Sequence, residues 1–239
     1  YFKLAADKGN NNAMLKYGMI LYHKEGAEAN YEECIKYIKK SADNECIEAM
    51  NFYAKMLFKG DKVKMNKRES FTYFKKAAEN GCIDSMKICA HMLSNGDGVN
   101  INLVDSLKYF KMAADKGDAD SMYEYANMLF VGKGIEVNKE KAAFYYKESA
   151  QKGHVNAMNK YAMMLLNGDG ISENKPQSLK YFKMAASFNH LDAMHNYARM
   201  LFVGEGIISP NKEEAIINLK EAAKKGHAES MFSYASILF

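Results

Sequence analysis

The most constraining feature of this chain is that it repeats itself. The segment AADKGDADSM at residues 113–122 recurs six more times with small changes, and every copy ends in methionine. These methionines are Met14, Met50, Met86, Met122, Met158, Met194 and Met231, so the step is 36 residues five times and 37 once. A fixed period of this length is typical of solenoids, in which each unit packs on its neighbours. We therefore predict an array of similar units.

Each unit has the pattern of two helices. Residues 120–131 place apolar side chains at i, i+3, i+4, i+6, i+7 and i+8, which predicts a helix with a wide buried face. Gly132 and Gly134 follow and end it, since glycine readily takes the left-handed conformation at a helix C-terminus. A second helix is predicted at 139–151, and only about three to five residues separate it from the next unit. Such short connections favour antiparallel neighbours, so the predicted fold is an all-α solenoid.

An asparagine precedes each second helix and predicts a helix N-cap. These residues are Asn30, Asn66, Asn102, Asn138, Asn174 and Asn211. Four have Glu or Gln three residues later, the spacing of a reciprocal capping box, namely Glu33, Glu69, Gln177 and Glu214, and Asp105 is a weaker candidate. Glu45 and Lys62 stand where other units have glycine. We expect each to cost up to about 1 kcal/mol if the left-handed backbone is kept.

Composition argues against several classes of function. The 33 basic and 29 acidic residues leave a net charge of +4 without a basic stripe, so nucleic acid is not an expected partner. The sequence contains no run of about 20 apolar residues, so no membrane span is predicted. The four cysteines do not recur in regular pairs, which favours reduced thiols and a cytoplasmic location.

The motifs AAxxGxxxAM, YAxML, GxGI, the capping Asn and the aromatic pair YF occur in this order along the whole chain. In these motifs the chain resembles the Sel-one-like repeat (SLR) family of the tetratricopeptide-repeat (TPR) superfamily. The resemblance implies a right-handed superhelix of helical hairpins of about 36 residues that recruits other proteins. It implies no common catalytic residues, so we expect a scaffold or adaptor and not an enzyme.

The expected organisation is one array over residues 1–239, about six and a half repeats and a fragment of a longer solenoid. The last first-type helix has no second helix to cover it, so Met231, Tyr234, Leu238 and Phe239 are expected to face water, and Gly26 is expected to end the first helix weakly. End-to-end contact with further repeats or subunits follows from this expectation. Two alternatives to the adaptor remain open: a structural component of a large assembly, and the regulatory repeat region of a longer protein such as a kinase.

Candidate binding residues are the variable positions one, two and five residues after each signature methionine. By resemblance to the superfamily, these positions line a concave groove. Amides there can pair with a peptide backbone and cations with its carboxylates. The alternative is an ordinary solvated face. The predicted partner-binding residues are Asn51, Lys55, Lys87, His91, Tyr123, Asn127, Asn159, His195, Arg199 and Phe232.

Two further columns of residues carry no predicted chemistry. The residue two before each methionine is acidic or an amide, which suits the first turn of a helix. Carboxylates one repeat apart in this column are expected to be about 10 Å apart, too far for a paired-carboxylate site. The residue four before each methionine could bind a metal, but residues of adjacent repeats are not expected to converge on one ion. These are Cys46, Cys82, Asp118, His154, His190 and His227. No catalytic, metal or cofactor site is therefore predicted, and no phosphate-binding loop is present.

Overall fold

A computed structural model describes residues 1–24 and 30–238 of the chain, which form fourteen α-helices and no strand. The expectations for Gly26 and Phe239 lie outside the described residues. Two kinds of helix alternate along the chain. We call A helices those that begin three residues before a signature methionine: α2 (Asn11–Tyr22), α4 (Ile47–Lys59), α6 (Ile83–Asn95), α8 (Ala119–Val131), α10 (Val155–Asn167), α12 (Leu191–Val203) and α14 (Ala228–Leu238). We call the others B helices: α1 (Phe2–Asp7), α3 (Tyr31–Asp43), α5 (Lys67–Glu79), α7 (Leu103–Asp115), α9 (Lys139–Gln151), α11 (Lys175–Ser187) and α13 (Lys212–Lys224).

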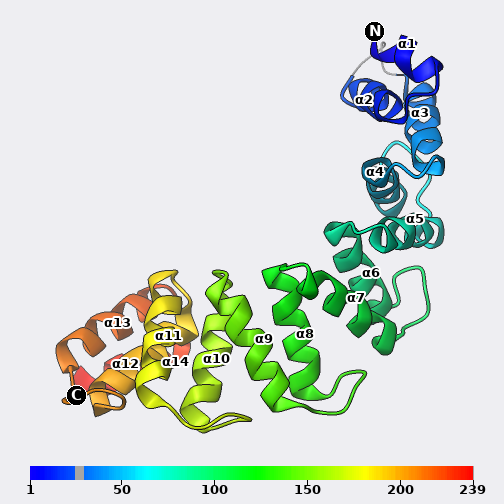
Figure 1. Ribbon diagram of the computed structural model, residues 1–239. Helices are drawn as coiled ribbons and strands as arrows, with labels where there is room; N and C mark the ends of the chain where they lie inside the picture. The colour runs from blue at the N-terminus through cyan, green and yellow to red at the C-terminus, as the bar shows by residue number, and fades with distance from the viewer. Residues whose placement is uncertain (25–29, 239) are drawn as a thin grey trace. The chain divides into compact units, whose positions relative to one another are not determined.

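The contacts divide the chain into two compact units, residues Tyr1–Lys116 and Gly117–Phe239. Within each unit an A helix packs against the B helix that follows it, and that B helix packs against the next A helix (Figure 1). Only three residues join α9 to α10, which leaves the chain no room except to reverse direction. The predicted all-α repeat architecture is therefore confirmed within each unit.

The core of each unit is made by the repeated apolar positions. The signature methionines from Met14 to Met194 are buried, as are the small residues that let helices approach, such as Ala142 and Ala150. The B helices contribute aromatic side chains, among them the fully buried Phe74 and Phe182. Burial of an aromatic or aliphatic side chain contributes about 1.5–3 kcal/mol, so this core stabilises the helices far more than their intrinsic propensity does.

All six predicted asparagine caps are confirmed, because each side-chain carbonyl accepts a hydrogen bond from the backbone N–H three residues later. The reciprocal contact differs from the expected capping box. Glu69 accepts from the side-chain amide of Asn66 at 3.0 Å, because the backbone N–H of Asn66 already donates to the carbonyl of Leu57. Glu33, Glu214 and Asp105 pair with their caps in the same way. Five of the caps thus join the A helix to the B helix, because their backbone N–H groups donate to a leucine carbonyl of the preceding A helix: Asn66, Asn102, Asn138, Asn174 and Asn211.

The two expected strained positions are also confirmed. Glu45 and Lys62 have φ angles of 63° and 60°, in the left-handed region that glycine occupies in other repeats. Lys62 gains compensating contacts, since its ammonium group lies 4.1 Å from the ring centre of Tyr22 and 4.5 Å from that of Tyr31. No helix that the structure describes combines the length and the apolar character needed to cross a membrane.

Candidate partner-binding face

All ten predicted binding residues lie on A helices. Those of the first unit are on α4 and α6, and those of the second unit are on α8, α10, α12 and α14. In the first unit, Lys55 forms an ion pair of 3.2 Å with Asp84 of the next A helix, and Asn51 accepts a 3.0 Å hydrogen bond from the hydroxyl of Ser85. His91 is exposed and packs edge-on against Phe110, while Lys87 is half-buried. The face is therefore tied together from one repeat to the next.

Two predicted residues of the second unit are engaged by aromatic neighbours. The ring of Tyr123 stacks on His154 of the next A helix, with ring centres 4.5 Å apart. The carbonyl of Asn127 accepts a 2.6 Å hydrogen bond from the hydroxyl of Tyr146 on α9. The amide oxygen that we expected to be available to a peptide backbone is thus already satisfied by the B helix.

Asn159 is the exception among these amides. Its side chain is 8% exposed, and within the described part of the chain its carbonyl oxygen has no hydrogen-bond partner. Asn51 finds its donor in Ser85, which lies 34 residues further along the chain, and His195 contacts Ser230, 35 residues further along. The residue 34 positions after Asn159 is Ala193, whose side chain has no donor. A buried amide without a partner is costly and therefore requires an explanation.

Three predicted residues line one pocket. His195 and Arg199 of α12 and Phe232 of α14 surround a mainly apolar cavity of about 250 Å³, completed by residues of α12, α13 and α14 such as Leu219. Phe232 is 77% exposed, and the guanidinium of Arg199 has an ion-pair neighbour in Glu205 at 3.7 Å, beyond hydrogen-bond length. A larger hollow of about 830 Å³ lies against α11 and α13, but its lining is as polar as it is apolar and contains none of the predicted residues.

The column four residues before each methionine provides the N-caps of the A helices. The Nδ1 atoms of His154, His190 and His227 accept hydrogen bonds from the backbone N–H three residues later, at 3.1, 3.3 and 3.2 Å. Removal of the ring from water lowers the pKa of His154 and of His190. A neutral imidazole is what this role needs, because protonated Nδ1 cannot accept. Sequence reasoning missed this role, although the spacing to the methionine could have indicated it.

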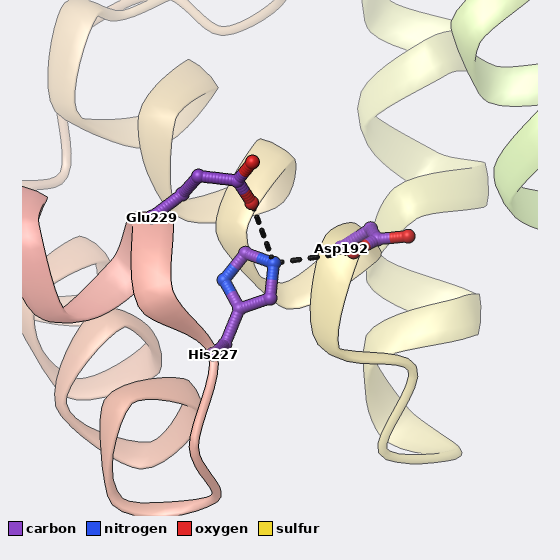
Figure 2. Close-up of side chains that lie close together, drawn as sticks. All are labelled: Asp192, His227 and Glu229. Atoms are coloured by element: carbon purple, nitrogen blue, oxygen red, sulfur yellow. Dashed lines mark hydrogen bonds and ion pairs between the residues drawn. The ribbon is translucent and has the colours of Figure 1, made fainter.

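Residues two and four positions before the methionines also contact each other at one point, which their spacing along the chain does not predict. His227 Nε2 lies 3.1 Å from a carboxylate oxygen of Asp192 on the preceding A helix and 2.9 Å from one of Glu229 (Figure 2). All three ligand atoms lie within 4.8 Å of one another. The expected separation of about 10 Å between carboxylates one repeat apart is therefore wrong for Asp192 and Glu229. Helix axes are about that far apart, but both side chains bend toward the same imidazole.

Comparison with known proteins places this geometry in a family. The family model of the Sel1 repeat matches residues 11–46, 47–82, 84–118, 119–154, 155–188 and 191–227. Curated proteins give no match. The chain is similar to the solved structure of c5321, a protective antigen of uropathogenic Escherichia coli with an SLR fold, at 21% identity and a TM-score of 0.88 over 99% of this chain. It spans 50% of the length of that protein.

A second similar structure is a Sel1 repeat protein from Oxalobacter formigenes, at 22% identity and a TM-score of 0.75, covering 94% of this chain and 87% of the other. At this identity the likeness concerns the fold. Sel1 is a TPR-like repeat, and proteins built from it generally serve as protein-interaction scaffolds and not as enzymes. With six consecutive matches over most of its length, the chain belongs to the Sel1 repeat family.

Proposed function

We propose that this chain is a non-catalytic adaptor whose second unit binds a peptide or helix presenting an apolar side chain next to a carboxylate. The observation that carries the proposal is the pocket lined by His195, Arg199 and Phe232. An apolar cavity with a few polar groups at its edge is the usual form of an anchor site. Its volume of about 250 Å³ suits one large side chain rather than a cofactor.

Charge supports the choice of occupant. Arg199 is an exposed cation at the pocket, and its distance of 3.7 Å from Glu205 leaves its donors able to pair with an incoming carboxylate. The exposed ring of Phe232 supplies the apolar contact, since aromatic side chains and arginine are enriched among residues that dominate binding energy. An acidic residue beside a leucine or aromatic anchor is therefore the chemistry that fits.

Selection of peptides from a random displayed library by the full chain tests the proposal. We expect the selected peptides to share an apolar anchor flanked by Asp or Glu. Phe232→Ala and Arg199→Ala should each weaken binding of a selected peptide by about 10-fold or more, the range of a binding hot spot. Fluorescence anisotropy of the labelled peptide measures this loss.

Matched controls come from the same unit. Ile208→Ala removes a fully exposed apolar residue outside the pocket, and Lys220→Ala removes an exposed cation that does not line it. Both variants should bind as the native chain does. Enrichment of no peptide, or equal binding by the Phe232 and Arg199 variants, would show that the pocket is part of an ordinary solvated face.

A second proposal concerns the exposed end of α14. Met231 is 47% exposed and Leu238 65%, whereas Met158 and Met194, the equivalents of Met231, are buried in repeats whose A helix packs against a following B helix. The B-type helix α1 exposes Leu4. We propose that α14 of one copy packs against α1 of another, as an A helix packs on a B helix within each unit. Sedimentation should show association that rises with concentration and is abolished by Leu238→Glu and by Leu4→Glu but not by Ile208→Glu. A chain that stays monomeric would contradict the proposal.

A further inference from the structure

The strongest unassigned cluster is the group of Asp192, His227 and Glu229 (Figure 2). Its two carboxylates approach one imidazole nitrogen from two helices, at 3.1 and 2.9 Å. Asp192 is on α12 and Glu229 in the first turn of α14, so the cluster bridges two A helices. Two carboxylates this close repel each other, and a single N–H can satisfy them only in part. A divalent cation would relieve that repulsion.

We propose that Asp192, His227 and Glu229 bind a zinc ion through His227 Nε2 and one oxygen of each carboxylate. Zinc accepts imidazole nitrogen and carboxylate oxygen at about 2.0–2.2 Å, which places ligand atoms about 3.3 Å apart in a tetrahedral site. The observed distances of 3.1 and 2.9 Å need to open by only a few tenths of an ångström. Water completes the fourth position, because both carboxylates are exposed to solvent.

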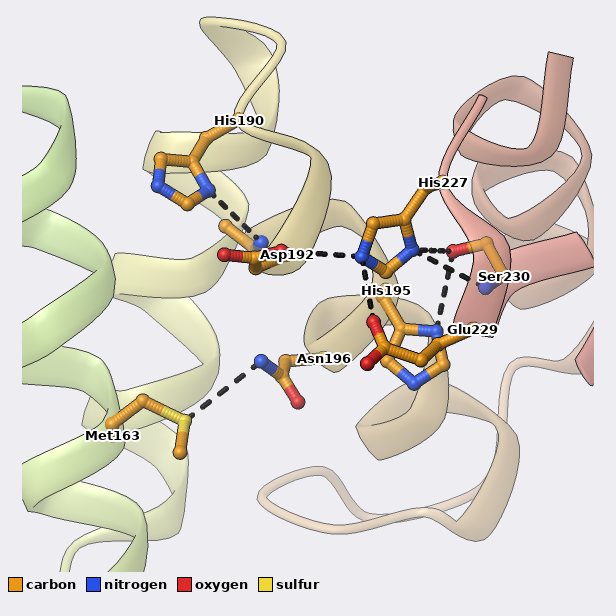
Figure 3. A network of polar contacts seen from close by, with 9 residues as sticks. Met163, His190, Asp192, His195, Asn196, His227, Glu229 and Ser230 are labelled. Carbon is orange, nitrogen blue, oxygen red and sulfur yellow. Dashed lines mark hydrogen bonds and ion pairs between the residues drawn. The ribbon is translucent and has the colours of Figure 1, made fainter. Parts of the chain in front are cut away.

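The surroundings of His227 hold the ring in the orientation this site needs. Its side chain is only 10% exposed, and Nδ1 lies 2.8 Å from the hydroxyl of Ser230, a residue that is fully buried (Figure 3). When Nε2 binds the ion, the ring proton moves to Nδ1 and is donated to the Ser230 oxygen. The Ser230 hydroxyl then donates to Nδ1 of His195, 3.2 Å away. Metal-bound histidines generally have such a partner on the other nitrogen. The 3.2 Å contact from the backbone N–H of Ser230 is given up.

Comparison with the other repeats explains why the site belongs to this junction. The equivalent histidine His154 lies 3.7 Å from Asp120, but Asn156 stands where Glu229 would provide the second carboxylate. At the junction of His190, the preceding repeat provides Asn156 instead of an acid. Among the described residues, only the His227 junction brings three such ligand atoms together. The pattern acid–histidine–acid, and not the capping histidine alone, defines the site.

Calorimetric titration of the full chain with zinc chloride tests the proposal. The measurements use a Cys46→Ser, Cys82→Ser background, because these two half-buried thiols could bind zinc by themselves. We expect one zinc ion per chain. His227→Asn should weaken zinc binding by about 100-fold, since loss of an outer partner alone costs about 10–100-fold. Asparagine caps the helices at Asn66 and Asn138, so this variant keeps the N-cap of α14.

His154→Asn is the matched control, because it makes the same change at a junction where Asn156 stands in place of the second carboxylate. It should leave the zinc affinity unchanged, and circular dichroism should show both variants folded. Asp192→Asn and Glu229→Gln should each weaken binding by about 10-fold or more. Native-like zinc affinity in the His227→Asn variant, or equal losses in the His154 and His227 variants, would overturn the assignment.

Discussion

The unpaired carbonyl of Asn159 leads to a prediction about stability. Replacing Ala193 with serine should supply the missing donor, because Ala193 occupies the position that Ser85 occupies relative to Asn51. The hydroxyl of Ser85 donates to the side-chain carbonyl of Asn51 at 3.0 Å. Asn51 and Ser85 are 34 positions apart in the chain, as are Asn159 and Ala193. We therefore expect Ala193→Ser to stabilise the second unit.

The magnitude follows from three effects. A hydrogen bond within a protein contributes about 0.5–1.5 kcal/mol net, and relief of a buried unpaired carbonyl adds to this, because an unpaired group costs about 1–3 kcal/mol. Serine has a lower helix propensity than alanine by a few tenths of a kcal/mol. Space is available, since serine is fully buried at this position in other repeats, at Ser85, Ser121 and Ser230. The expected gain is about 1 kcal/mol, or about 2–4 °C in Tm for a chain of this size.

Urea unfolding followed by circular dichroism measures the free energy of unfolding. A double-mutant cycle with Asn159→Leu isolates the proposed pair, because leucine removes the acceptor and the equivalent Leu15 is buried in its repeat. The stabilising effect of Ala193→Ser should disappear in the Asn159→Leu background. The coupling free energy should therefore be about 1 kcal/mol.

Ala49→Ser provides the control variant. Ala49 is fully buried at the same position of its repeat, but the residue 34 positions before it is Leu15, which has no acceptor. This variant should gain nothing and lose up to about 1–3 kcal/mol for the buried hydroxyl. If Ala193→Ser and Ala49→Ser change the stability equally, or if the gain persists without the Asn159 amide, the explanation from the unpaired carbonyl is wrong.

Three further predictions follow from the structure. The pKa of His154 is lowered from 6.5, chiefly by burial, so the stability that the neutral ring provides is complete above pH about 6.5 and is lost as the pH falls through the lower folded-state pKa. Urea unfolding at pH about 7.5 and about 5 measures the free energy of unfolding at each pH. Between these two pH values it should fall less for His154→Asn than for the native chain, and an equal fall in both would refute the role of this ring. Glu45→Gly should stabilise the first unit by up to about 1 kcal/mol, because φ at this position is 63°, and a lower Tm would contradict this. A thiol reagent should label native Cys46 and Cys82 quickly but not the buried Cys34 and Cys89. Desolvation raises the thiol pKa of Cys34 to about 11 and that of Cys89 to about 12. Equal labelling of all four would show that burial does not protect the latter two.

The capping asparagines show how far local rules reach. A short polar side chain before an amphipathic segment is satisfied by the helix that follows it, so all six caps could be predicted from spacing alone. The partner of Glu69 could not be predicted in the same way. It depends on the backbone N–H of Asn66 being taken by Leu57, a contact between two helices.

The candidate site shows the same division. The variable positions of the A helices could be inferred from the period, and three of them, His195, Arg199 and Phe232, do line one pocket. Their neighbours could not be inferred, because contacts within and between repeats depend on how far each side chain reaches. Thus Asn127 is satisfied by Tyr146 of its own repeat, while Asn159 is left without a partner by a single methyl group at Ala193.

The sequence by itself determined the repeat length, the two helices of each repeat, their ends and the absence of a strand pattern. Each of these depends on residues close together in the chain, and the period multiplies the signal sevenfold. Only the tertiary structure decided that Asp192, His227 and Glu229 converge, that the capping histidines turn Nδ1 to the backbone, and that a pocket opens between α12 and α14. Those features arise where side chains of successive repeats meet, and their geometry depends on helix packing and on side-chain rotamers rather than on spacing along the chain.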